Sequence, residues 1–350
     1  MFFKKSIALH RKNPIKPTFK NKREALKQIA LGIDIGGTYT KLSAVTDEGK
    51  ILGKSSFPTS ARPGQDAYPD RLLASAKKLL YQQGPVELLG VGIGAPGCDP
   101  LRGYINYAVN LPFSAPFPIR HFFEDNLCAH TELIKDSLAA ALGEKMWGGA
   151  RDMNHFAVLT LGTGLGSAFY LNGQLLSGAH QLAGELGHTM HIPGGRQCSC
   201  GQRGCLETYI SASGLRRTFT ALMAETTLSS PLRHIPETKR SARHITEAAR
   251  TGDKLAQQAL QQCGKDIGEA LAKIVLQIDP EGIFLAGGLA QAGALLLDII
   301  QEELNRNLLP PFRGKVTVRF SELGPEVAGT LGAAAQIFQT KQHSRIHPKS

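Results

Sequence analysis

GELGHTMHIPGGRQCSCGQRGCLE, at residues 184–207, places a histidine and three cysteines at short spacings in one stretch of the chain. His188, Cys198, Cys200 and Cys205 are ligand types that suit a tetrahedral Zn²⁺ site. Four protein ligands would leave no open position for an activated water. The pattern therefore predicts a structural Zn²⁺ ion rather than a catalytic one.

Two glutamates bracket these donors and are available for another role. Glu185 lies at the start of the stretch and Glu207 at its end. A metal-braced loop between two acidic groups predicts a rigid binding site for a polar ligand. The alternative is that both glutamates are ordinary surface carboxylates. His191 is an alternative metal ligand, but the spacing favours His188.

Composition predicts a globular chain without a membrane span. A chain of 350 residues with 42% hydrophobic content can bury the cores of two domains. No apolar run approaches the roughly 18 residues of a membrane span, and the first residues do not form a signal peptide. Six cysteines, three of them clustered, fit a reducing compartment with one metal site better than a disulfide framework. We expect a cytoplasmic protein.

The net charge of +11 belongs to the two ends of the chain. Residues 1–28 hold nine Lys or Arg and one Glu, and residues 341–350 add three basic residues. The intervening 29–340 balance 28 basic against 28 acidic residues. We interpret 1–28 as a basic extension and 341–350 as a basic tail, both solvated, rather than as nucleic-acid-binding surfaces.

Strand and helix patterns alternate along the rest of the chain, which predicts the α/β class. We place a domain boundary near 145–155, giving an N-terminal α/β domain at 29–148 and a C-terminal one at 149–326. Each half opens with a hairpin around a glycine-rich turn, and residues 216–250 are expected to form helices and loops that cover the second domain. The expected strands are within 29–45, 87–93, 133–135, 156–161, 168–171 and 283–286; the expected helices are 136–147, 255–278, 293–304 and 327–340.

Three glycine turns follow predicted strands. Glycine after a buried strand lets backbone N–H groups approach an anion closely. Asp34 ends the strand before the first turn, where a carboxylate can hold hydrated Mg²⁺ against phosphates. Each turn alone is more often an ordinary tight turn, so the combination carries the prediction. The turn residues are Gly36, Gly37 and Thr38, then Gly162, Thr163 and Gly164, then Gly287 and Gly288.

Two common nucleotide-binding motifs do not account for these turns. The chain has no GxxxxGK[ST] loop. A dinucleotide fingerprint fails at 162–167, where Ser167 occupies the third glycine position. The glycines at 90–95 match GxGxxA, but Pro96 and Gly97 follow in place of a helix start.

Taken together, the motifs resemble the ROK family of sugar kinases and related repressors over roughly residues 29–340. The cysteine spacing, His-x9-Cys-x-Cys-x4-Cys, is the spacing of that family. The matching segments are DIGGT at 34–38, GAPG at 94–97, DSLAAALGE at 136–144, LGTGLGS at 161–167, GELGH at 184–188, CSCGQRGCLE at 198–207 and LAGGL at 285–289.

The resemblance implies an actin-like ATPase fold, with two α/β domains facing a cleft. ATP with Mg²⁺ would lie across the glycine turns and the sugar deeper in the cleft. The helix at 327–340 would return to the first domain. Many members of the family are dimers, so a homodimer is expected.

The resemblance also implies roles for individual residues. Asp136 would take the proton from the attacking sugar hydroxyl, although a helix N-cap is its ordinary interpretation. Glu185, His188 and Glu207 would hold sugar hydroxyls, with His188 also bound to zinc. Asn110 lies in a segment that lines the sugar side of the cleft in the family. An asparagine before Leu-Pro is also common in ordinary turns.

The chain departs from the family at two positions beside Asp136. Lys135 replaces the usual asparagine and cannot accept a hydrogen bond. Leu138 replaces a second asparagine. Three alternatives follow: Lys135 points away and the pocket is merely altered, it pairs with an acidic or phosphorylated sugar, or it pairs with Asp136 and depresses the pKa of that base.

Two functions follow from the sequence. The first is an ATP-dependent kinase that phosphorylates a hydroxyl of a hexose or N-acetylhexosamine, with Asp136 as general base. The alternative is a non-catalytic or weakly active sugar-binding protein of the same fold. Family repressors carry an N-terminal winged-helix domain, and about 50 residues is the usual minimum for a domain. Because 28 residues precede Ile29, we expect no DNA-binding module of that type.

Overall fold

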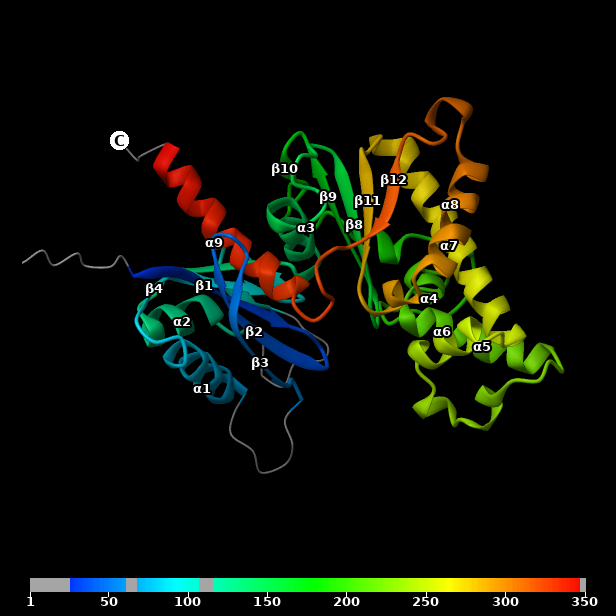
Figure 1. The fold of residues 1–350 in the computed structure, drawn as a ribbon, viewed down its shortest axis with the longest axis horizontal. Helices are drawn as coiled ribbons and strands as arrows, with labels where there is room; N and C mark the ends of the chain where they lie inside the picture. The colour runs from blue at the N-terminus through cyan, green and yellow to red at the C-terminus, as the bar shows by residue number, and fades with distance from the viewer. Residues whose placement is uncertain (1–25, 61–67, 107–115, 347–350) are drawn as a thin grey trace, which may run out of the picture.

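The structure is a computed structural model, and it describes residues 26–60, 68–106 and 116–346. Within these residues the chain forms two five-stranded sheets with helices packed on them (Figure 1). A short ribbon of β5 (Cys98–Asp99) and β6 (Tyr104–Ile105) lies outside both sheets. No helix in the described ranges has both the length and the apolar character needed to cross a membrane.

The first sheet has the strand order β3-β2-β1-β4-β7. Side chains alternate between the two faces of a strand. In β1, Ile29, Leu31 and Ile33 therefore pack with helices α1 (Tyr68–Tyr81) and α2 (Ile119–Leu127), whereas Ala30 packs with α9 (Ala328–Ile346). The strands are β1 Lys27–Ile35, β2 Tyr39–Thr46, β3 Ile51–Pro58, β4 Val86–Gly94 and β7 Thr131–Ile134.

The second sheet repeats this arrangement with the order β10-β9-β8-β11-β12. In both sheets three consecutive strands form an antiparallel meander, and two later strands add in parallel. The strands are β8 Phe156–Leu161, β9 Leu165–Leu171, β10 Gln174–Leu175, β11 Gly282–Ala286 and β12 Thr317–Phe320.

Helices α5, α6, α7 and α8 cover the outer face of the second sheet and form the largest apolar core with it. Between β10 and α5 runs the segment 184–207, which we call the cysteine loop. The helices are α4 Glu207–Ile210, α5 Ala212–Glu225, α6 Ala242–Arg250, α7 Lys254–Ile278 and α8 Ala294–Asn307; the short 3-10 helices are η1 Leu186–His188, η2 Pro231–His234, η3 Glu237–Lys239, η4 Gly288–Ala292 and η5 Pro310–Phe312.

Helix α3 (Asp136–Trp147) lies between the two sheets and contacts α9 on one side and β8 and β9 on the other (Figure 1). Helix α9 lies so close to the first sheet that larger residues would collide there. A Cβ atom on Gly32 would lie 1.9 Å from the Thr330 carbonyl oxygen, and one on Gly92 would lie 1.8 Å from that of Ala333. Glycines on β1 and β4 therefore set the position of α9 and, through it, of α3.

The expected α/β class is confirmed, and the strongly patterned elements lie where the sequence places them. The strand expected at 168–171 begins earlier, at Leu165, and the one expected at 133–135 ends at Ile134. Lys135 is instead the extended residue before α3. The sequence patterns did not indicate β3, α1, α2 or β12, because these elements are short or only partly buried on one face.

The close packing of α9 predicts that Gly92→Ala is destabilising, although alanine is tolerated in most strands. The new methyl group must displace the α9 backbone, and overpacking of this kind costs about 1–3 kcal/mol. Urea denaturation should show that loss. Gly324→Ala is the matched control, because its Cβ atom would meet only a Val327 methyl group at 3.7 Å. Equal stability of the two variants would contradict this account of the packing.

Candidate active site

A cleft of about 1770 Å³ opens between the two sheets, and residues of both halves line it. Gly36 and Gly288 adjoin lining residues in the chain, and Asp34 lies three residues before Gly37; Cys198 and Cys205 lie behind the lining residue Cys200 in the cysteine loop. Asn110 lies outside the described residues. The predicted site residues that line the cleft are Gly37, Thr38, Lys135, Asp136, Gly162, Thr163, Gly164, Glu185, His188, Cys200, Glu207 and Gly287.

Asp136 is the first residue of α3 and is exposed to the cleft. Its Oδ1 atom accepts a hydrogen bond of 2.8 Å from the Ser137 backbone N–H. Although solvent reaches the carboxylate through the cleft, the surrounding protein removes most of its water. This burial raises its pKa, the Ser137 N–H lowers it, and the nearby charge of Glu185 raises it further. A carboxylate with a raised pKa is a better proton acceptor than an ordinary aspartate.

Asp34 is the penultimate residue of β1 and lies close to Asp136. Burial raises the pKa of Asp34 to about 6, with a further rise from the Asp136 charge and an opposing effect from Lys41. The carboxylate lies against the first turn of α9, where a Cβ atom on Gly329 would come within 2.5 Å of Oδ2. Two neighbouring carboxylates with raised pKa values suit a hard divalent cation, so the residues present fit Mg²⁺.

The first glycine turn is braced by buried hydroxyl groups. The Gly36 N–H donates to the Tyr39 carbonyl oxygen at 3.1 Å, and the Thr59 hydroxyl donates to the Gly36 carbonyl oxygen at 2.6 Å. Thr59 Oγ1 lies 3.0 Å from Thr40 Oγ1, which in turn lies 2.8 Å from the Tyr68 hydroxyl. The turn is therefore held in one conformation before any ligand binds.

The second and third glycine turns belong to the second sheet. The Gly162 carbonyl oxygen accepts a hydrogen bond of 2.8 Å from the Ala212 N–H at the start of α5. Gly287 has a φ of 93°, and a side chain there would collide with the Leu161 backbone. Both turns thus lie at the ends of buried strands, and their glycines Gly162, Gly164 and Gly287 line the cleft.

Glu207 joins the cysteine loop to the second glycine turn. Its Oε2 atom accepts a hydrogen bond of 2.9 Å from the Leu165 N–H. The Cys198 thiol lies 3.9 Å from its other oxygen. A Cβ atom on Gly164 would lie 2.5 Å from the same carboxylate, so glycine is needed for this contact. Movement of the loop would therefore move this turn as well.

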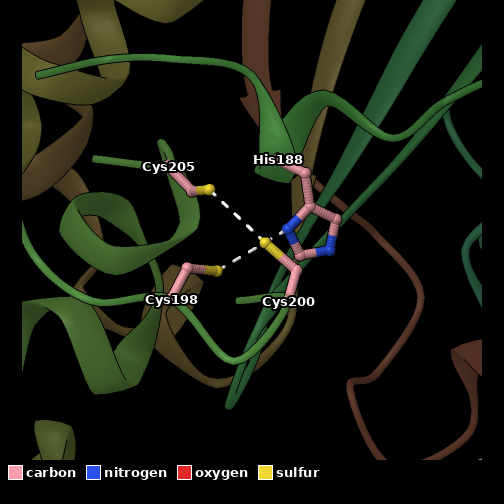
Figure 2. Close-up of side chains that lie close together, drawn as sticks. All are labelled: His188, Cys198, Cys200 and Cys205. Carbon is pink, nitrogen blue, oxygen red and sulfur yellow. Dashed lines mark hydrogen bonds between the residues drawn. The ribbon is translucent and has the colours of Figure 1, made fainter. Parts of the chain in front are cut away.

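The four predicted metal donors lie together (Figure 2). Their ligand atoms are all within 4.8 Å of one another. Cys198 Sγ lies 3.7 Å from His188 Nδ1, and Cys200 Sγ lies 3.6 Å from Cys205 Sγ. Zn–S bonds of about 2.3 Å in a tetrahedron place sulfurs about 3.8 Å apart, so the donor set fits Zn²⁺.

The alternative ligand His191 faces away from this cluster. Its Nε2 atom lies 3.3 Å from Asp266 Oδ1 on α7, and both side chains are buried. The loop returns on itself at Gly204, whose φ is 87°, and a Cβ atom there would lie 1.8 Å from the Ile192 carbonyl oxygen. Backbone conformation and the His191 contact therefore hold the loop in addition to the four donors.

Comparison with known proteins agrees with this geometry. The ROK family model matches residues 30–340. A glucokinase of Thermotoga maritima is 34% identical over 310 residues, which cover 88% of this chain and 96% of that protein. The chain belongs to the ROK family. A ROK family glucokinase from Streptomyces griseus, solved in complex with glucose and AMPPNP, has a TM-score of 0.77 at 30% identity and covers 89% of this chain and 99% of that one.

A regulator of the ROK family has a similar fold. The transcriptional regulator described as a homolog of the Escherichia coli MLC protein gives a TM-score of 0.79 at 26% identity, covering 90% of this chain and 78% of that one. Sequence identity with the two glucokinases is higher than with this regulator, which supports placing the chain in the sugar kinase branch of the family. The actin-like ATPase fold of the ROK kinases is likewise confirmed.

At the position where this chain departs from the usual ROK pattern, the structure shows an ion pair. Lys135 Nζ lies 3.2 Å from Glu185 Oε1. The alternative in which Lys135 pairs with Asp136 is therefore wrong, because its partner is Glu185. The Lys135 charge does lower the pKa of Asp136, but burial and the Glu185 charge raise this pKa overall. The alternative in which Lys135 points away from the site is wrong as well, because Lys135 lines the cleft.

Sequence reasoning missed several polar residues of the cleft. Ser213 and Arg217 lie one turn apart on α5 and both line it. Their spacing of four residues on a helix capped by Ser211 was the available signal. The expectation that 216–250 covers the second domain holds for α6, which packs in the core of the second sheet. It does not hold for Arg217, which lines the cleft. Asp99 and Arg102 also line the cleft, from a turn without a recognisable motif.

The donor geometry predicts bound zinc that Cys200→Ser removes. Elemental analysis should find zinc in the wild-type protein and little in the variant, since a lost thiolate opens the tetrahedral site. Sugar affinity should fall more than ATP affinity, because the cysteine loop carries Glu185 and His188. Cys128→Ser, at an exposed cysteine far from the loop in sequence, should retain zinc. Equal losses of sugar and ATP affinity would contradict the assignment of the loop to the sugar side.

The raised pKa of Asp34 predicts a trade-off between stability and function. A folded pKa of about 6 against 3.9 unfolded means that the native state binds more protons between these values, so stability falls as pH rises from about 4 to 6. Asp34→Asn should remove this pH dependence and stabilise the fold at pH 7 by up to about 3 kcal/mol, while its affinity for Mg²⁺ falls. Urea denaturation across pH measures this, with Asp152→Asn at an exposed turn as control.

Proposed function

We propose that this chain transfers the γ-phosphate of ATP to a hydroxyl group of a hexose or N-acetylhexosamine, with Asp136 as general base. The observation that carries the proposal is the position of the Asp136 carboxylate at the start of α3. It faces the cleft between the glycine turns and the acidic residues of the cysteine loop. ROK family membership and the similar glucokinases support an ATP-dependent hexose kinase as the general activity.

Asp136 would act on the sugar hydroxyl rather than on ATP. Phosphoryl transfer needs alignment and charge neutralisation more than covalent chemistry from the protein. The hydroxyl oxygen forms the new bond to the γ-phosphorus, its proton passes to the Asp136 carboxylate, and the bond to the leaving oxygen of ADP breaks. Asp34 would hold Mg²⁺, which supplies charge neutralisation for the phosphates when bound.

The cysteine loop would supply the sugar contacts. Glu185 and Glu207 can accept hydrogen bonds from hydroxyl groups, and both line the cleft. His188 directs Nδ1 toward Cys198. If this nitrogen binds zinc, the ring is fixed and Nε2 remains available for a hydroxyl group. This arrangement explains why a structural metal would lie beside a sugar pocket.

The second candidate is a sugar-binding protein without turnover, supported by the similar fold of the ROK family regulator. A coupled ADP-release assay over a panel of hexoses and N-acetylhexosamines separates the two functions. Turnover supports the kinase. Sugar-induced thermal stabilisation without turnover supports the binding protein.

We predict that Asp136→Asn lowers kcat by about 10²- to 10⁴-fold, the usual contribution of a general base. Because the pKa of Asp136 is raised, the wild-type kcat should fall as pH decreases through that pKa, where the base becomes protonated. Pre-steady-state and steady-state assays measure both effects. Asp125→Asn, at an exposed position of α2, serves as control. A variant that keeps wild-type kcat would exclude Asp136 as the base.

A further inference from the structure

The ion pair between Lys135 and Glu185 joins residues that lie 50 positions apart in the chain. Lys135 follows β7 of the first sheet directly, whereas Glu185 precedes η1 in the cysteine loop, which packs on β9 of the second sheet. The 3.2 Å contact between Nζ and Oε1 therefore crosses the cleft from one half of the molecule to the other. It does so beside Asp136, the residue that follows Lys135.

The two partners differ in their environment. The Lys135 side chain is 11% exposed and that of Glu185 is 59% exposed. A buried ammonium ion needs a charged or hydrogen-bonding partner, whereas an exposed carboxylate does not. Lys135 is thus held by the protein around it, and we expect it to determine where the more exposed Glu185 carboxylate lies.

We propose that Lys135 is a positioning residue that holds Glu185 toward a neutral sugar and ties the two halves of the cleft together. This inference rests on the proposed sugar-binding role of Glu185. It assigns to Lys135 an indirect role, in which its ammonium group acts on the sugar through Glu185 rather than through a contact of its own.

The carboxylates around Lys135 favour a neutral sugar over an acidic or phosphorylated one. The Lys135 charge is matched by Glu185, which leaves Asp136 and Glu207 as further carboxylates near the same part of the cleft. A substrate carboxylate or phosphate placed there would have to displace Glu185 from Lys135 and would meet the other acids. Neutral hydroxyl groups can bind Glu185 while the ion pair remains.

The ion pair also affects the proposed base. The Asp136 carboxylate is faced by Lys135 at its own helix end, by Glu185 across the cleft, by Asp34 of β1 and by the Cys98 thiol of β5. Glu185 raises the pKa of Asp136 and Lys135 lowers it. Removing either charge should therefore shift the acid limb of the kcat–pH profile, in opposite directions.

The test is a double-mutant cycle with Lys135→Met, Glu185→Gln and the combined variant, measured as sugar dissociation constants by calorimetry with glucose, mannose and N-acetylglucosamine. Each single change should weaken binding of the preferred sugar about tenfold, the effect of one charged hydrogen bond. The combined variant should bind no more weakly than Glu185→Gln alone, because both act through the same carboxylate. ATP affinity should not change.

Additive losses would show that Lys135 contacts the sugar directly, and tighter binding of glucose 6-phosphate or glucuronate than of glucose would show that it serves an acidic ligand; either result overturns the proposal. Arg306→Met is the matched control, because it breaks the ion pairs with Glu302 and Glu303 on α8, away from the cleft. This variant should bind sugar like the wild type.

A measurement without ligand keeps the inference separate from the proposed function. Glu185→Gln leaves the Lys135 ammonium ion without its carboxylate and should lower Tm by about 2–4 °C, whereas the same change in the Lys135→Met background should have no effect. Equal shifts in both backgrounds would overturn the ion-pair role even if the enzyme phosphorylates sugar. If wild-type turnover is absent but the thermal coupling and sugar-binding cycle hold, the kinase proposal fails and the positioning role stands.

In the active enzyme the kcat–pH profile adds a readout that a purely structural role would not change. The acid limb should move to higher pH in Lys135→Met and to lower pH in Glu185→Gln, and the two shifts should largely cancel in the combined variant. An acid limb that stays unchanged in all three variants would contradict the placement of these charges beside Asp136.

Discussion

The close approach of α9 to the first sheet is the constraint on which the site depends. Glycines on β1 and β4 allow the helix backbone to lie against the strands, and Gly332 allows α3 to lie equally close to α9. Because α3 is fixed by this contact, its first residue, Asp136, lies next to the end of β1 and therefore next to Asp34. The Asp136 charge helps to raise the pKa of Asp34, and the two residues meet because of helix packing rather than because of any local motif.

One side of the cleft consists mainly of backbone groups and the other mainly of side chains. The side proposed for nucleotide consists of backbone turns held by hydrogen bonds, such as the Thr59 contact to Gly36. The side proposed for sugar consists of side chains on the cysteine loop, whose position depends on the metal donors, on His191 and on Glu207. Backbone turns suit phosphate groups, which are the same in every nucleotide. Side chains can differ from one protein to another according to the sugar that each one binds.

Much of the fold and site was predictable because the signals are local in sequence. The strand–glycine turns, the start of α3 and the four metal donors each lie within a short segment, and the structure places the donors together. The ion pair of Lys135 with Glu185 was not predictable, since nothing in the sequence indicates which residues 50 positions apart meet. The position of Arg217 in the cleft was missed because its spacing from Ser213 marks one face of a helix without indicating that this face meets the cleft.

The return of α9 to the first sheet has a consequence for the order in which the protein can be assembled during synthesis. The second sheet and its covering helices lie within residues 156–320, so this unit can fold as soon as that segment has left the ribosome. The first sheet begins earlier in the chain, yet Ala30, Val45 and Leu89 remain uncovered until α9 packs on them. The half that is made first is therefore completed last, and its apolar face is the part of the nascent chain most exposed to aggregation.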